Sequence, residues 1–130
     1  FQITPRFWIR SGGKILGETI DFGDQPRGGL AIGERDGWVP ILSVAPMLPR
    51  EILRNIARAA GCHVYTDHLG QVFHCDGYLG MYFHEGGKCT MRLPSPARVC
   101  DVFDGRVIAE HADTFSIEAR ENTTVLFQLS

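Results

Sequence analysis

The sequence predicts an α+β protein that is mostly β, in which a strand–helix–strand unit is followed by a small antiparallel β-sandwich or meander. Three observations lead to this fold class. The 15 glycines and 7 prolines divide the 130 residues into short runs, which is typical of many strands joined by turns. Only residues 49–60 have a helical spacing of apolar side chains. Through most of the second half, apolar and polar residues alternate with the period of two that strands require.

Composition places the chain among soluble globular proteins. Hydrophobic residues make up 44% and charged residues 22%, and a chain of this length buries a core of its own. With 13 basic and 15 acidic residues the net charge is −2, so charge gives no reason to expect a nucleic acid or a membrane as partner. No apolar run reaches the length of a membrane span. We interpret a chain that starts at Phe1 as a fragment or a processed product.

In the first half we expect strands at 6–10, 15–22, 29–34 and 38–44. Gly12-Gly13 and Asp36-Gly37 are suited to the turns between them, and residues 25–28 look like a loop. The helix at 49–60 begins with Pro49, whose missing N–H costs nothing at the first helical position. Gly61 is suited to the left-handed residue that ends a helix. An apolar stripe, expected to belong to the core, consists of Ile52, Leu53, Ile56, Ala57 and Ala60. A short buried strand is expected at 62–65.

In the second half, alternation predicts that two sets of side chains point to opposite faces of a sheet. The set expected to point one way is Phe73, Leu79, Met81 and Phe83, and the set expected to point the other way is Tyr78, Tyr82 and His84. Pro94-Ser95-Pro96 is interpreted as a rigid turn between strands at 90–93 and 97–103. Asp104-Gly105 is a hairpin signal before 106–110. Further strands are expected at 115–119 and 125–129.

Several segments around the helix carry a resemblance to a known family. They are Asp36-Gly37-Trp38, Leu48-Pro49, Leu53-Arg54-Asn55-Ile56-Ala57-Arg58, Ala60-Gly61 and His63-Val64-Tyr65, with Leu79, His84, Arg92-Leu93-Pro94, Val99, Asp101, Phe103 and Gly105 further on. This pattern resembles the C-terminal region of bacterial glycoside-hydrolase-type, β-galactosidase-like proteins. The resemblance implies that residues 1–66 end a glutamine-amidotransferase-like, flavodoxin-like α/β domain and that residues 67–130 form a C-terminal antiparallel β-domain. It also implies that a catalytic barrel lies upstream.

The sequence assigns no catalytic residue, no metal ligand and no cofactor. The histidines, cysteines and aspartates between His63 and Cys89 match no zinc-ligand spacing, and no pair of carboxylates stands out as a glycosidase acid and base. The four cysteines are interpreted as free, mostly buried thiols, which favours a reducing, cytoplasmic compartment. Aromatic side chains stack on sugars, so the residues assigned to carbohydrate binding are Tyr78, Tyr82, His84 and Trp38. The same rings are suited to covering the seam between the two halves, and this is the interpretation that we favour for them.

The function expected from these observations is a non-catalytic accessory or assembly module of a glycoside-hydrolase-like, carbohydrate-processing protein. The alternatives are a carbohydrate-binding module and a small standalone hydrolase. Upstream domains of the same protein are the expected partners, and a second copy of the chain or a carbohydrate is also consistent with the sequence. The chain alone is not expected to be an enzyme, whereas the parent protein would be a glycoside hydrolase.

Overall fold

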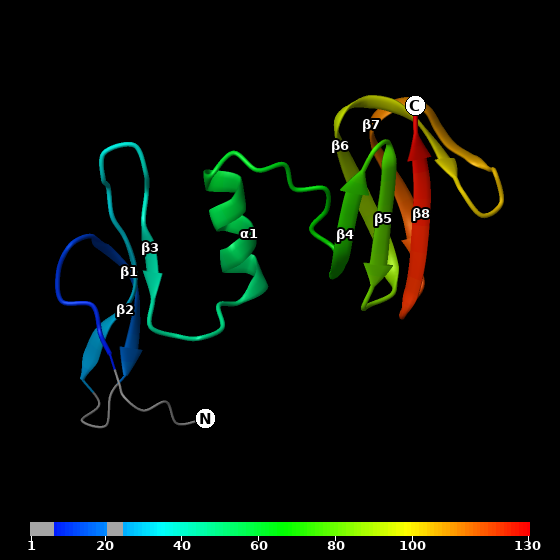
Figure 1. Cartoon of the computed structure of the whole chain (residues 1–130). Helices are drawn as coiled ribbons and strands as arrows, with labels where there is room; N and C mark the ends of the chain where they lie inside the picture. Colours follow the sequence, from blue (N-terminus) through cyan, green and yellow to red (C-terminus); the bar gives the residue numbers. More distant parts are fainter. Residues whose placement is uncertain (1–6, 21–24) are drawn as a thin grey trace. The chain divides into compact units, whose positions relative to one another are not determined.

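The computed structural model describes residues 7–20 and 25–130 and is mostly β, with one helix and two antiparallel sheets (Figure 1). This confirms the fold class predicted from the sequence. The chain divides into two compact units, Phe1–Leu53 and Arg54–Ser130. The division falls inside the helix, whereas the sequence suggested a boundary near Thr66-Asp67.

The N-terminal unit contains a three-stranded antiparallel sheet in the order β1-β2-β3, formed by β1 (Lys14–Ile20), β2 (Pro26–Ile32) and β3 (Ile41–Ser43). The loop expected at 25–28 is wrong, because β2 already begins at Pro26. Its glycines allow close approach of backbone: a Cβ at Gly28 would lie 2.6 Å from the carbonyl oxygen of Ile9. Glycine here marks a crowded strand and not a loop.

Other elements of this unit are shorter than expected. The strand expected at 6–10 is reduced to an isolated bridge between Ile9 and Gly28, and residues 6, 21 and 22 of the expected strands lie outside the described residues. The turn at Asp36-Gly37 is confirmed, since Arg35 and Trp38 exchange backbone hydrogen bonds across it. A flavodoxin-like sheet is mostly parallel, whereas β1, β2 and β3 are antiparallel. The assignment of residues 1–66 to the end of such a domain stays a prediction.

The predicted helix is confirmed as α1 (Arg50–Ala59). It ends in a Schellman motif, in which the N–H of Cys62 bonds to the carbonyl of Ala57 and the N–H of Gly61 to that of Arg58. No residue of α1 is buried, so the expectation that its apolar stripe belongs to the core is wrong. Residues 62–65 form no strand, because Tyr65 makes only a single backbone bond, to Arg92, and no ladder.

The C-terminal unit is a five-stranded antiparallel sheet in the order β4-β5-β8-β6-β7. Its strands are β4 (Gly70–Cys75), β5 (Tyr78–Phe83), β6 (Gly87–Asp101), β7 (Val107–Ala119) and β8 (Thr123–Leu129). The first part of β6 pairs only with β7, whereas its last part pairs with both β7 and β8. The long hairpin β6–β7 therefore curls over β5 and β8 to form a sandwich-like second layer.

The Pro94-Ser95-Pro96 segment lies within β6 and does not separate two strands, which corrects the predicted turn. Arg92 lies opposite Thr114 and Ala97 lies opposite Ala112, so β6 is longer than β7 over this stretch and bulges outwards. Proline cannot donate to a ladder and is tolerated in strands at such bulges. The bulge lies where β6 passes from the second layer to the first.

The core of the molecule lies between these two layers. Its buried members are Leu79, Met81, Phe83, Cys89, Met91, Leu93, Val99, Phe115, Ala119 and Phe127. Phe115 and Phe127 stack edge to face, with 5.4 Å between ring centroids, the arrangement that aromatic pairs prefer. The prediction that Leu79, Met81 and Phe83 point to one face is confirmed, and this face is the core. The core is therefore supplied almost entirely by residues after the helix.

Candidate functional site

The most distinctive surface of the C-terminal unit is the side of strands β4, β5 and β8 that faces away from the core. Directly opposed residues of antiparallel strands point to the same side, so the strand register fixes which side chains share it. Three rows result, Cys75–Tyr78–Gln128, Phe73–Gly80–Leu126 and Gln71–Tyr82–Thr124. We call these nine residues the outer face. All nine are exposed or half-buried.

None of the nine residues of the outer face carries a charge at neutral pH. The second layer provides a contrast in the same fold. Its outward positions pair Lys88 with Glu118 and Arg92 with Thr114, as expected for a solvated sheet face. The nine residues of the outer face are therefore neutral. The same side of the first layer continues onto the last part of β6, where Cys100 lies opposite Gln128 and Arg98 pairs with Ser130.

Aromatic side chains dominate the outer face. Phe73 is 64% exposed and Tyr78 is 44% exposed. Tyr82 is half-buried and its hydroxyl donates to Oδ1 of Asn122 at 3.0 Å. Gly80 lies among them, and a Cβ at this position would be in ordinary van der Waals contact with Leu126 Cδ1, at 3.6 Å, and with two carbonyl oxygens, at 3.8 and 4.0 Å. The outer face therefore carries the three aromatic rings of Phe73, Tyr78 and Tyr82.

Phe73 points to the outer face and not towards Leu79, Met81 and Phe83, which corrects the prediction. The cause is the two-residue turn Asp76-Gly77, where both residues have positive φ, 47° and 78°, as a type I′ hairpin requires. This turn places Cys75 opposite Tyr78 and therefore Phe73 opposite Gly80. Recognising Asp-Gly as a hairpin signal would have revealed this from the sequence.

The other two residues assigned to carbohydrate binding do not belong to the outer face. His84 follows β5 and stacks edge-on against Tyr82, with 4.8 Å between ring centroids. Trp38 belongs to the N-terminal unit, where it is 61% exposed. The structure therefore brings together Tyr78 and Tyr82, with His84 beside Tyr82, and adds Phe73 and Leu126, which the sequence did not reveal.

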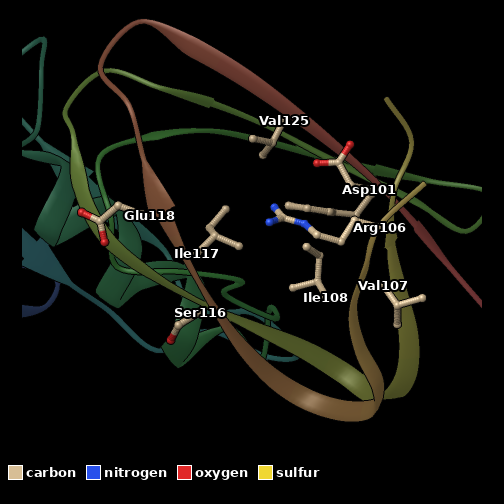
Figure 2. A pocket seen from close by; sticks show the side chains of 9 residues that line it. Asp101, Arg106, Val107, Ile108, Ser116, Ile117, Glu118 and Val125 are labelled. Atoms are coloured by element: carbon tan, nitrogen blue, oxygen red, sulfur yellow. The ribbon is translucent and has the colours of Figure 1, made fainter. Parts of the chain in front are cut away.

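A recess of about 430 Å³ opens between β7 and β8 on the other side of the first layer. It is lined by Asp101, Arg106, Val107, Ile108, Ser116, Ile117, Glu118, Val125 and Phe127. Figure 2 shows the Arg106 side chain extending into its middle, while Glu118 lies at the far side and points away. Asp101 accepts the backbone N–H of Phe103 at 2.8 Å. The two carboxylates of the recess therefore do not flank a common space, as an acid and a base acting on one glycosidic bond must.

A charged cluster connects the second half of α1 with β6. The carboxylate of Asp67 contacts Arg58 at 2.5 Å, Arg92 at 3.1 Å and Arg54 at 3.5 Å. The hydrogen bond from Arg58, together with the charges and contacts of Arg58 and Arg92, lowers the pKa of Asp67, although partial desolvation opposes this. Because one carboxylate satisfies three guanidinium groups, the cluster is a structural anchor and not an acid or base.

The four cysteines are free thiols, but they are not mostly buried. Cys62 and Cys75 are exposed, Cys100 is half-buried and Cys89 is fully buried. Cys89 Sγ contacts Thr66 Oγ1 at 3.4 Å and donates to Met91 Sδ at 3.6 Å. Burial raises the pKa of the Cys89 thiol, which keeps it protonated and suits a core position instead of a nucleophile.

Within residues 7–20 and 25–130, no three histidine, cysteine, aspartate or glutamate side chains come together as metal ligands. In the same part of the chain, α1 is too short and too polar to cross a membrane. Compared with known proteins, the chain matches no family model, no curated protein and no solved structure.

Proposed function

We propose that the chain is a non-catalytic accessory module that assembles with upstream domains of a glycoside-hydrolase-like, carbohydrate-processing protein. The observation that carries this proposal is the apolar surface of the N-terminal unit. Among its described residues Ala31 is the one buried hydrophobic side chain. The large apolar residues that are exposed there include Ile15, Leu16, Ile20, Trp38, Val39, Leu42 and Met47.

An apolar surface of this extent has a physical consequence. A three-stranded sheet is stable when it buries one face against another element. Apolar burial stabilises by roughly 25 cal/mol per Å², so the small side chain of one buried alanine contributes little to the stability of this unit. Contiguous exposed apolar groups mark sites of protein association. Leu53, at the end of this unit, is also 53% exposed. Further protein that covers these groups is the simplest source of the missing burial.

The resemblance favours upstream domains of the same polypeptide as that further protein. Extending the reading frame upstream of Phe1 is expected to encode a catalytic barrel. A start codon immediately before Phe1 would contradict the proposal. The complementary experiment replaces Leu42 by Asp in the parent protein, where the loss of apolar burial is expected to weaken assembly. Leu42 is 58% exposed in the chain, so the same change should leave the isolated chain folded.

The absence of catalysis is tested separately. The isolated chain, incubated with a panel of aryl glycosides, is expected to show no turnover above buffer. Asp101→Asn and Glu118→Gln are the informative variants, because these carboxylates line the recess. Turnover that either change abolishes would establish a standalone hydrolase instead.

A further inference from the structure

We infer that three arginine side chains of the C-terminal unit form a binding site for a phosphate group, carried by inorganic phosphate or by a small phosphate monoester. They are Arg54 and Arg58 of α1 and Arg92 of β6, and we call them the arginine triad. All three lie in the same compact unit as the carboxylate that they share, that of Asp67. The inference is independent of the accessory role, which rests on the N-terminal unit.

The arginine triad already converges on an oxyanion. Asp67 Oδ1 lies 2.5 Å from Nη2 of Arg58 and 3.5 Å from Nη1 of Arg54. Asp67 Oδ2 lies 3.1 Å from Nη1 of Arg92. Two side chains one turn apart on a helix and a third from a separate strand therefore meet at one group. Guanidinium groups bind carboxylate and phosphate through the same charge-assisted hydrogen bonds, so Asp67 occupies the kind of position that an external phosphate group would take.

The charge at this site is not balanced. Asp67 supplies one negative charge to three positive charges, and no other carboxylate of the described residues forms an ion pair with the arginine triad. Elsewhere in the same unit the pairing is one to one, as between Arg98 and Glu110 at 2.9 Å. A phosphate monoester carries about 1.5 to 2 negative charges at neutral pH. Its charge therefore matches the excess of the site, whereas a single carboxylate would leave part of the excess uncompensated.

Hydrogen-bond donors remain for such a group. The Arg54 side chain is only 20% exposed, yet its contact with Asp67 is the longest of the three. A largely desolvated cation with so distant a partner is costly. In Arg54 and Arg92, Nε and the second terminal nitrogen have no partner among the described residues, and Nη1 of Arg58 makes only a 3.5 Å contact with Asn55. A tetrahedral phosphate group offers an oxygen to each guanidinium.

The site is open to solvent, and its internal anion can be displaced. The side chains of Arg58, Arg92 and Asp67 are all about half exposed, so a ligand reaches the arginine triad without rearrangement of the core. Asp67 repels a second anion while it occupies the centre of the triad. We therefore expect weak binding in the unchanged chain and tighter binding where this carboxylate is removed.

The test is a titration of the isotopically labelled chain with inorganic phosphate and with glycerol 3-phosphate, followed by amide NMR at constant ionic strength. Acetate and glycerol are the comparisons, since the first carries a single charge and the second none. Both phosphates are expected to shift amides in the second half of α1, next to Asp67 and next to Arg92, with a millimolar dissociation constant. Acetate should bind about threefold more weakly or less tightly still, and glycerol should cause no shifts.

Three variants and a matched control make the test specific to the arginine triad. Arg58→Gln and Arg92→Gln are expected to weaken phosphate binding by about three- to tenfold each, through loss of a charge-assisted contact. Asp67→Asn should strengthen it by about fivefold, because one negative charge about 4 Å away is removed. Arg98→Gln is the control. Arg98 lies on the same strand as Arg92 and its side chain is equally exposed, but it is already paired with Glu110, so its loss should leave the affinity unchanged.

Four results would overturn the inference. They are shifts with phosphate no larger than those with acetate, unchanged affinity of Arg58→Gln and Arg92→Gln, equal or weaker binding by Asp67→Asn, and a loss in Arg98→Gln equal to that in Arg92→Gln. The last would show a diffuse response to net charge and not a site. Amide spectra of each variant before titration establish that the fold is retained. Phosphate should also raise the melting temperature of Asp67→Asn more than that of the unchanged chain, because a ligand that binds only the folded state stabilises it.

Discussion

Arg92 contacts Asp67 with 3.1 Å between Nη1 and Oδ2 and thereby ties the segment after α1 to strand β6. The same carboxylate accepts from Arg58 of the helix, and the Arg92 carbonyl is 2.8 Å from the Nε2 atom of His63. These contacts tie the end of the helix to the β-domain. The boundary between the two units therefore lies within α1 and not at its end.

Replacing Asp67 by Asn should loosen this anchor. The three arginines would then repel one another without a compensating charge. Exposed ion pairs contribute only about 0.2 to 1 kcal/mol each, so we expect global stability to fall by about 1 kcal/mol. Hydrogen exchange of the amides in the last turn of α1 should accelerate more than exchange in β5. Glu51→Gln is a suitable control, because Glu51 pairs with Arg50 outside the cluster. Equal exchange in both variants would contradict the anchoring role.

The anchor should also depend on pH. Asp67 has a lowered pKa in the folded chain, so its contribution is present above the pKa of the unfolded carboxyl and is lost as the pH falls through the folded value. The window lies below the ordinary range of aspartate. Between neutral pH and strongly acidic pH, the difference in unfolding free energy between the unchanged chain and Asp67→Asn should shrink towards zero. A difference independent of pH would show that charge is not responsible.

Thiol reactivity should follow burial. In the native chain a thiol reagent is expected to modify Cys62 and Cys75 rapidly and Cys100 more slowly. Cys89 should react only on unfolding, because burial both shields the sulfur and raises the pKa of its thiol. In denaturant without reductant all four thiols should react. Fewer than four would indicate a disulfide in the purified protein, and rapid native labelling of Cys89 would contradict its core position.

The energetic weight of the two halves should differ sharply. Phe83→Ala should lower the free energy of unfolding by about 3 to 5 kcal/mol, because it leaves a cavity in the core. Ile56→Ala should cost about 1 kcal/mol or less in the isolated chain, since Ile56 is only half-buried. Denaturant unfolding curves of both variants measure this difference. Similar losses would show that the helix belongs to the core after all.

Local signals in the sequence predicted much of the fold. The Gly61 end of α1, the turns at Asp36-Gly37 and Asp104-Gly105, and the shared face of Leu79, Met81 and Phe83 are all consequences of nearby residues, and the structure confirms them. Pro49, expected at the first helical position, lies just before the helix, where its carbonyl accepts the first helical hydrogen bond. What the sequence did not reveal depends on long-range pairing. Taken alone, Pro94-Ser95-Pro96 predicts a turn. The pairing of Arg92 with Thr114 and of Ala97 with Ala112 shows that it is a bulge within one strand.

The candidate binding site could be predicted only in part for the same reason. Tyr78 and Tyr82 share a face by alternation along one strand, which a sequence shows directly. Phe73 and Leu126 join them only through the registers of β4 with β5 and of β5 with β8. A register is set by turn geometry and by the partner strand, and the partner β8 is far away in the sequence. Alternation within a single strand therefore could not reveal this surface.

The passage of β6 through both layers has a consequence for how the β-domain unfolds. A single unbroken strand cannot leave one layer without disturbing its pairing in the other. The two layers should therefore open together, as one cooperative foldon. The bulge at Pro94-Ser95-Pro96 is exposed and is the one part of β6 that this coupling between the layers does not constrain. It is a point at which inserted residues would lengthen an existing excursion of the backbone without separating the strands on either side.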